Sequence, residues 1–166
     1  MNTSGEPQAL IVSSPVAGLT APLEATPDPV FADRMMGDGL AIHPLSGEIR
    51  APFDGEIVTL HESAHAVVLR SAEGVEVLIH VGIDTVALKG RGFAPAVTAG
   101  DPVSRGDLLI SFDLDEVGLA STSLVTPIIV TNPDAFTIVR RNLGCAVQTS
   151  DEVMMLLPSD SVQHDA

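Results

Sequence analysis

The sequence of 166 residues lacks several features on which whole classes of protein depend. It has a single cysteine, Cys145, so no disulfide can form within the chain. Trp and Tyr are absent and aromatic residues make up 3%, which leaves few rings on which bases or sugars could stack. No apolar run approaches the roughly 18 to 20 residues of a membrane span, so we expect no direct membrane insertion. No Lys or Arg precedes an early apolar stretch, so we predict no signal peptide and expect a cytoplasmic protein.

Positive charge is also scarce. The chain has 8 Lys and Arg against 22 Asp and Glu, a formal net charge of −14. A surface this acidic repels phosphate backbones and anionic membranes, which argues against nucleic acid as a partner and favours partners that carry Arg and Lys. Hydrophobic residues make up 45% and the mean hydropathy is +0.33, which argues against a disordered chain. The length fits one domain, whose core can close without disulfides or a structural metal.

Glycine and proline, by contrast, are plentiful and spread throughout, with 14 and 12 residues. Between them lie short runs rich in Val, Ile and Leu, at residues 9–12, 40–43, 56–60, 66–69, 75–81, 108–112 and 127–131. Frequent breakers between short β-branched runs are typical of many strands and tight turns. We therefore expect an all-β fold, a compact antiparallel sandwich or barrel, with short helical turns only near 29–36 and 115–119. The domain is expected at 10–157, after a flexible segment at 1–9 and before a polar tail at 158–166.

Two stretches repeat a turn and the strand that follows it. Residues 14–18 read Ser-Pro-Val-Ala-Gly and residues 51–55 read Ala-Pro-Phe-Asp-Gly, each followed by an apolar run. A third unit at 99–107 has the same rhythm of turn and strand. Such repeats predict duplicated hairpins within the sandwich or barrel.

The string His61-Glu62-Ser63-Ala64-His65 matches the H-E-x-x-H pattern of zinc proteases. That chemistry needs both histidines one helical turn apart, with the Glu activating a metal-bound water. Here strand-like runs lie on both sides, at 56–60 and 66–69, and the Val residues that follow favour a strand over the required helix.

His65 and His80 make a better-supported pair. Two apolar runs lie between them, joined by Ser71-Ala72-Glu73-Gly74, a sequence suited to a hairpin turn. A symmetric hairpin places the two histidines directly opposite each other on one face, with Val67 and Leu78 beside them. A bulge in the turn would shift the register by one residue and send them to different faces. The sequence leaves both registers open.

A pair of imidazoles suits two kinds of chemistry. Neutral imidazole is a good nucleophile near pH 7 and can carry a phosphoryl group, while a second imidazole can donate a hydrogen bond to the phosphate oxygens. Alternatively the two nitrogens could bind zinc, but they fill only half of its tetrahedron, and the chain offers no obvious third ligand.

The segment around His80 resembles one family. Residues 78–86 read Leu-Ile-His-Val-Gly-Ile-Asp-Thr-Val and residues 88–93 read Leu-Lys-Gly-Arg-Gly-Phe, which is similar to the active-site segment of the glucose-type enzyme IIA family. These proteins are phosphocarriers of the bacterial sugar phosphotransferase system (PTS). Residues 28–42 resemble the family's early segment and residues 126–132 its late one. The resemblance implies a compact all-β sandwich-barrel of duplicated hairpins and a phosphotransferase component.

The resemblance also implies roles for single residues. His80 would be phosphorylated, with His65 beside it and the backbone carbonyl of Gly82 holding the His80 ring. Ser63 stands where the family usually has Thr, so its hydroxyl could assist. An apolar ring with an acidic rim would surround the histidines and receive a basic partner. The ring residues are Val30, Phe31, Met36, Leu78 and Val86, and the rim residues are Asp38, Asp84 and Asp134.

The chain departs from the family pattern at three positions near these histidines. His61 and Leu78 stand where relatives commonly have Phe, and Ala64 replaces a frequent Asn. These changes put partner preference and affinity in doubt, not phosphoryl chemistry.

We therefore expect a phosphocarrier that accepts a phosphoryl group on His80 from the histidine phosphocarrier protein. It would pass the group to the IIB domain of a sugar permease, and no cofactor is required. A second hypothesis is a regulatory docking module, whose binding to enzymes or transporters is disrupted when His80 is phosphorylated. In such a complex His65, His80 and a partner carboxylate could hold zinc. The third hypothesis is a zinc-dependent hydrolase that uses His61, Glu62, His65 and His80.

Overall fold

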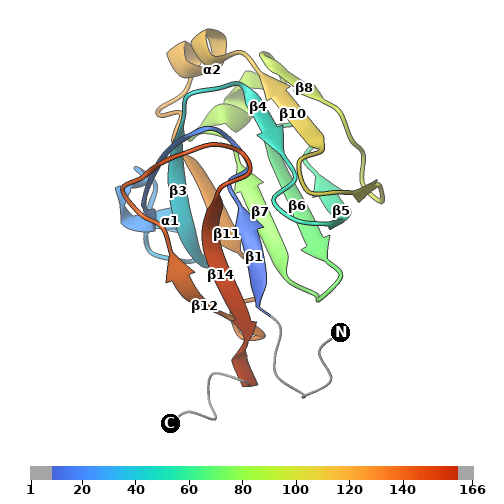
Figure 1. Ribbon diagram of the computed structural model, residues 1–166. Coiled ribbons are helices and arrows are strands. Elements are labelled where there is room, and N and C mark those ends of the chain that lie inside the picture. Colours follow the sequence, from blue (N-terminus) through green and yellow to red (C-terminus); the bar gives the residue numbers. More distant parts are fainter. Residues whose placement is uncertain (1–8, 161–166) are drawn as a thin grey trace.

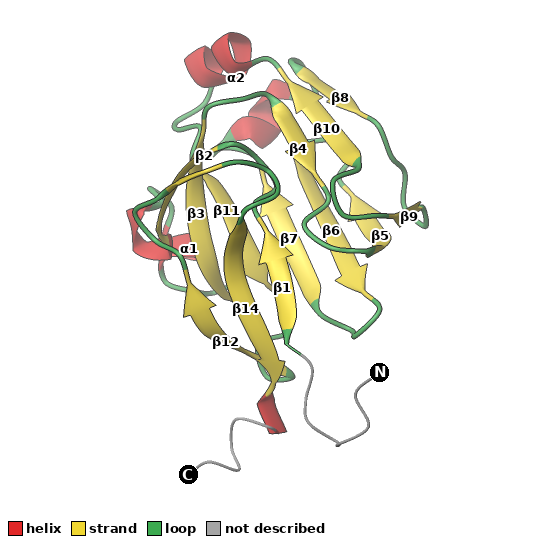
Figure 2. Ribbon diagram, in the orientation of Figure 1, coloured by secondary structure: helices red, strands yellow, loops and turns green. Residues whose placement is uncertain are grey.

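The structure, a computed structural model, describes residues 9–160 and is built almost entirely from short antiparallel strands (Figure 2). The expected flexible segment at 1–9 and the expected tail at 158–166 lie mostly outside the described residues. Among the described residues no helix is long and apolar enough to cross a membrane.

Eight strands form one large sheet. They are β2 (Gly18–Pro22), β3 (Asp38–Pro44), β5 (Gly55–Leu60), β6 (Ala66–Ser71), β7 (Glu76–His80), β9 (Pro102–Val103), β11 (Thr126–Val130) and β13 (Ala146–Val147). Their order across the sheet is β13-β2-β3-β11-β7-β6-β5-β9, and each neighbouring pair is antiparallel.

Two three-stranded sheets and several short helices complete the described chain. One small sheet has the order β1-β14-β12 and the other β4-β10-β8, from β1 (Leu10–Ser13), β4 (Glu48–Arg50), β8 (Phe93–Pro95), β10 (Leu108–Phe112), β12 (Phe136–Arg141) and β14 (Glu152–Pro158). The helices are α1 (Pro29–Ala32), α2 (Leu114–Ala120) and the 3-10 turns η1 (Leu23–Ala25) and η2 (Thr85–Leu88).

The main core lies between the large sheet and the two small ones. In Figure 1, β1 and β14 cross in front of β11 and β7, which gives the layers of a sandwich. Alternate residues of the central strands enter this core, as Val77 and Ile79 of β7 do, and both are fully buried. The expected all-β sandwich is confirmed, whereas the sheets of residues 9–160 do not close into a barrel.

The duplication predicted from the repeated turns is visible in the order of the strands. Read inward from the two edges, the large sheet matches β13 with β9, β2 with β5, β3 with β6, and β11 with β7 at the centre. The repeated turns exchange equivalent hydrogen bonds, because the Ser13 N–H donates to the Pro52 carbonyl (3.0 Å) and the Arg50 N–H donates to the Pro15 carbonyl (2.7 Å). The two halves are thus related by an approximate twofold axis between β7 and β11.

The third repeat unit has a different counterpart from the one expected. In the turn at 104–107 the Ser104 N–H donates to the Asp107 carboxylate, and in the turn at 148–151 the Gln148 N–H donates to the Asp151 carboxylate, both at 2.8 Å. These turns lead into β10 and β14, which occupy the middle of the two small sheets. The unit at 99–107 therefore matches the turn before β14, not the turns before β2 and β5.

Candidate phosphoryl-transfer site

The face of the large sheet that points away from the main core carries a second, smaller apolar cluster. Leu78 of β7 belongs to it, together with Leu23, Phe31, Ile83 and Ile129. His80 follows Leu78 by two residues, so its side chain leaves the strand on the same face. The His80 ring lies 5.0 Å from the ring of Phe31, measured between centroids. His80 therefore sits at the end of β7, against this cluster.

The sequence allows two registers for the hairpin that leads to His80, and the structure has the one that is shifted by one residue. Ala66, and not His65, pairs with His80 across β6 and β7. The reason is the turn, which has three loop residues and ends on Gly74 at a positive φ of 98°. The symmetric register is therefore wrong, and Val67 enters the main core instead of lying beside the histidines.

The two imidazoles nevertheless meet. His65 precedes the regular part of β6, after a turn in which Ala64 takes a φ of 59°, and its carbonyl accepts the N–H of Val81 at 2.7 Å. Its ring stands edge-on to that of His80, with centroids 4.9 Å apart. The predicted neighbours are confirmed, although the turn before β6 brings them together and not a strand pair.

One hydrogen bond decides which nitrogen of His80 can react. Its Nδ1 lies 2.8 Å from the backbone carbonyl of Gly82, and a carbonyl only accepts, so Nδ1 carries the proton. Burial lowers the pKa of the His80 imidazole below its usual value, although the Gly82 carbonyl and the nearby Asp28 carboxylate act in the opposite direction. The ring is therefore neutral at pH 7, with a free lone pair on Nε2.

The backbone that presents this carbonyl requires glycine. Gly82 has a φ of +74°, and a Cβ there would lie 2.7 Å from the Cγ2 of Thr85 and 3.0 Å from the Ser123 carbonyl oxygen. The buried hydroxyl of Thr85 donates to the Val81 carbonyl at 2.6 Å, which fixes the turn from the other side. The loop after β7 is thus locked around the position of His80.

His65 is the more deeply buried member of the pair, with 3% of its surface exposed. Burial and the neighbouring rings of His80 and His61 lower the pKa of its imidazole to about 4. Its Nδ1 is buried and has no hydrogen-bond partner among the described residues. His65 is therefore neutral at pH 7, and Nε2 is the ring nitrogen that remains for a hydrogen bond.

The segment that matches the zinc-protease pattern forms a tight turn between β5 and β6. The Ala64 N–H donates to the His61 carbonyl at 2.8 Å, and the Ser63 N–H donates to Nδ1 of His61 at 3.0 Å. The ring of His61 contacts that of His65, with centroids 4.4 Å apart. Residues 61–65 thus form a turn and not the helix that a zinc protease needs. The hydrogen bond that Ser63 makes to His61 comes from its backbone N–H and not from the hydroxyl group.

Comparisons with known proteins identify the family of this chain. The family model for the phosphoenolpyruvate-dependent sugar phosphotransferase system, EIIA 1, matches residues 10–136. The chain belongs to the EIIA 1 family. It is 45% identical over 144 residues to the PTS system glucose-specific EIIA component of Bacillus cereus, covering 86% of this chain and 87% of that protein. The corresponding component of Halalkalibacterium halodurans is 38% identical over 156 residues, which cover 94% of this chain and 90% of that one.

A solved structure supports the same conclusion. The glucose permease IIA from Mycoplasma capricolum superposes with a TM-score of 0.86 at 38% sequence identity, over 89% of this chain and 96% of that one. The predicted family resemblance is therefore confirmed. As an EIIA component, the chain is a phosphocarrier of sugar uptake and belongs among the transferases of the PTS.

The apolar residues that the resemblance assigned to a docking face fall into two groups in this EIIA chain. Phe31 and Leu78 are buried in the second cluster, each with 6% of its surface exposed. Val30, Met36 and Val86 are accessible, at 38%, 46% and 51%. Three of the five apolar residues are thus accessible, and their role in docking stays a prediction.

The three acidic residues assigned to the rim differ in their surroundings. Asp38 is ion-paired with both Arg34 and Arg141, so two guanidinium groups balance its charge. Asp84 is exposed and accepts a hydrogen bond from a threonine hydroxyl. Asp134 is exposed in the turn that follows β11. Their part in docking also stays a prediction.

Sequence reasoning missed one carboxylate near the reactive ring, that of Asp28. The charge of Asp28 acts to raise the pKa of His80, against the larger effect of burial. The same carboxylate caps α1 by accepting a hydrogen bond from the N–H of Val30 at 2.9 Å. An Asp directly before a Pro is a typical N-terminus of a helix, so the sequence could have placed Asp28 at the N-terminus of α1. Because Phe31 of α1 contacts His80, the same signal pointed to the site.

The residues at the site do not form a metal centre by themselves. Among residues 9–160 no group of three or more His, Cys, Asp or Glu is placed to hold a metal ion. His65 and His80 supply two nitrogens, and a tetrahedral zinc ion needs further ligands. The geometry therefore gives no support to the zinc-hydrolase hypothesis.

Proposed function

We propose that His80 is the residue that carries the phosphoryl group in this EIIA chain. The observation that supports it best is the hydrogen bond from Nδ1 to the Gly82 carbonyl, which leaves the lone pair of Nε2 free on a neutral ring. Neutral imidazole is an effective nucleophile near pH 7. Ser63 and Asp84 remain supporting residues by family resemblance.

The transfer is a displacement between two imidazoles. The lone pair of His80 Nε2 forms the new N–P bond while the N–P bond of the donor breaks, and the donor imidazole leaves with that electron pair. His65 then donates its Nε2–H to a phosphoryl oxygen, which stabilises negative charge during transfer and on the phosphorylated protein. Because each imidazole is both nucleophile and leaving group, the reaction runs in both directions and requires no cofactor.

Two protein partners follow from this chemistry. The donor is the histidine phosphocarrier protein, and the acceptor is the IIB domain of a sugar permease in the cytoplasm. The curated relatives are named as glucose-specific components, so we propose a glucose permease as the acceptor. The net charge of −14 and the accessible apolar residues beside His80 suit partners with basic residues around an apolar centre.

Zinc has a place only in a complex. His65 and His80 would be two of its ligands, and a carboxylate from the partner would be the third. Such a complex belongs to the regulatory hypothesis, in which phosphorylation of His80 adds about −1.5 to −2 charges to an apolar surface and releases the partner.

The test is the intact mass of the protein after incubation with phosphoenolpyruvate, the first enzyme of the PTS and the histidine phosphocarrier protein. We expect one acid-labile phosphate on the wild type and none on His80→Gln. His65→Gln should still accept phosphate but pass it on at least tenfold more slowly, since the glutamine N–H does not lie where the imidazole donor was and losing a well-placed donor typically costs about 10²- to 10³-fold. Phosphate retained on His80→Gln would contradict the assignment.

A further inference from the structure

The orientation of His65 has no hydrogen bond to hold it. An imidazole whose one nitrogen does chemistry is usually fixed by a hydrogen bond at the other nitrogen, as Nδ1 of His80 is by Gly82. In His65 that second nitrogen, Nδ1, is buried without a partner among the described residues. Something other than a hydrogen bond must therefore keep its Nε2 directed at His80.

Contacts with two neighbouring rings can do so. The His80 ring stands edge-on to His65 with centroids 4.9 Å apart, and the His61 ring contacts His65 with centroids 4.4 Å apart and the planes inclined by 60°. Both neighbouring rings are held by backbone groups. The Gly82 carbonyl holds His80, and the Ser63 N–H donates to Nδ1 of His61 at 3.0 Å. The ring of His65 therefore packs against two rings that are themselves fixed to the backbone.

The space behind His61 shows why this contact matters. His61 lines an open cleft of about 570 Å³, together with Glu62, Ser63, Val86 and Lys89. Water fills such a cleft, so no packed side chain stands ready to replace the ring of His61. Without that ring, His65 would border solvent on this side and could rotate away from His80.

We propose that His61 is a positioning residue that holds His65 in the orientation needed for phosphoryl transfer at His80. The proposal rests on the proposed function of His65 and His80. Contact with a flat ring is what the proposal requires of His61, and no bond from His61 to the phosphate is involved. A ring of similar shape at position 61 should therefore serve equally well.

The experiment compares His61→Ala with His61→Phe, using Glu62→Ala as the control from the same cleft. Each variant is first phosphorylated and its mass measured, and the rate of phosphoryl return to the histidine phosphocarrier protein is then followed. We expect His61→Ala to be slower by roughly tenfold to a hundredfold, the loss typical of a reacting group misplaced by about 1 Å. His61→Phe and Glu62→Ala should stay within about twofold of the wild type.

A second readout follows the ring itself. Proton NMR should show contacts between the rings of His65 and His80 in the wild type and in His61→Phe, and their loss in His61→Ala, while the melting temperatures stay similar. An unchanged rate in His61→Ala would overturn the proposal, and so would a His61→Phe variant as slow as His61→Ala. A wild type that takes up no phosphate would instead refute the proposed function of His80.

Discussion

The chemistry of the site depends on keeping two imidazoles neutral, and burial does this for both. His80 is desolvated against Phe31 and donates a hydrogen bond from Nδ1–H to the Gly82 carbonyl, so its Nε2 is ready to attack. His65 is almost fully buried beside two other rings, which keeps a proton off its ring at neutral pH. An imidazolium at His80 would have no lone pair for the attack, and an imidazolium at His65 would be a buried charge with no carboxylate beside it among the causes that set its pKa.

This burial predicts a dependence of stability on pH. The imidazole of His65 has a pKa of about 4 in the folded protein and about 6.5 when unfolded, so between these values only the unfolded chain binds the proton. The free energy of unfolding should therefore be highest above pH 6.5 and fall as the pH drops toward 4. From pH 7.5 to pH 5.0 the loss due to His65 should be about 2 kcal/mol.

Urea unfolding of the wild type and of His65→Gln at these two pH values measures the effect. Because the glutamine does not titrate, the variant should lose less stability on acidification by about the amount that His65 contributes. Equal losses in the two proteins would show that His65 is not held neutral by the fold.

At the scale of elements, the sequence predicted five strands of the large sheet but missed others, among them the buried middle strand β14 and the short edge strands β9 and β13. All seven apolar runs became strands, because a strand in the core needs a continuous or alternating apolar pattern. The short edge strands β9 and β13 carry no such pattern. The sequence left the register of β6 and β7 open, because one additional residue in the turn shifts every residue pair between the two strands. The positive φ of Gly74 gives this turn its third loop residue and so decides the register.

The turn after β7 offers a prediction about the element that holds His80. In Gly82→Ala the new Cβ would combine a positive φ of 74° with contacts of 2.7 Å to Thr85 and 3.0 Å to Ser123. We expect a loss of about 1 to 3 kcal/mol in the free energy of unfolding. Phosphoryl uptake should also fall more than tenfold, because the carbonyl that fixes the His80 ring must shift.

The matched control is Gly100→Ala. Gly100 has a positive φ of 94°, yet nothing lies within 4 Å of a Cβ built there. It should show the cost of the backbone conformation alone, about 1 kcal/mol, with normal phosphoryl uptake. If Gly82→Ala behaved like this control in both measurements, the loop after β7 would not be what positions His80.

At the scale of the whole molecule, two similar halves carry one site. The repeated turns allowed the duplication to be predicted from the sequence, since equivalent Pro residues recur before β2 and β5. The family motif around His80 allowed the reactive histidine to be named. The contact of His61 with His65 could not be predicted, because it depends on how a turn at the edge of one half folds back onto the next strand. The ion pair of Asp38 with Arg141, which comes from a distant segment, could not be predicted either.

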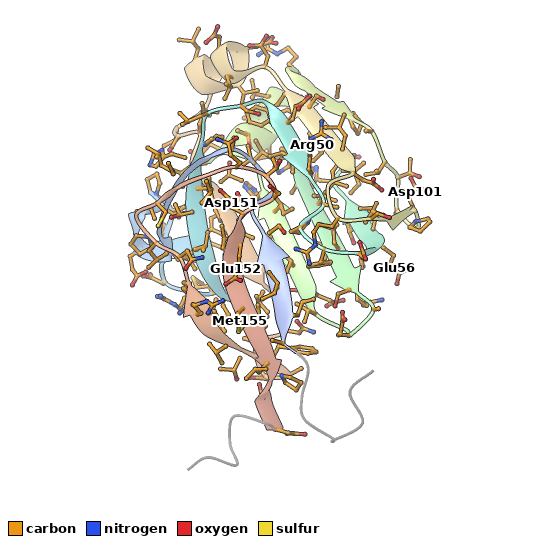
Figure 3. All side chains as sticks on the ribbon, in the orientation of Figure 1. Arg50, Glu56, Asp101, Asp151, Glu152 and Met155 are labelled. Atoms are coloured by element: carbon orange, nitrogen blue, oxygen red, sulfur yellow. The ribbon has the colours of Figure 1, made fainter. Side chains whose placement is uncertain are left out.

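The net charge of the whole molecule leads to a last prediction, about the rate of association with a basic partner. Acidic residues lie on separate parts of the surface, as Asp101 and Asp151 do in Figure 3, so the field of −14 charges is not confined to one site. Salt shortens the reach of this field from about 10 Å at 0.1 M to about 3 Å at 1 M. Phosphoryl transfer from the histidine phosphocarrier protein should therefore slow by about tenfold over that range under conditions where encounter limits the rate.

Two single-charge variants separate steering by the whole surface from contact at the site. Asp84→Asn removes a charge beside the loop that holds His80, whereas Glu73→Gln removes one in the hairpin turn at the opposite end of β7. Both should lower the rate at low salt, but Asp84→Asn by more, and the two should converge with the wild type as salt screens the charges. A rate that does not change with salt would mean that apolar contact, and not charge, brings the partners together.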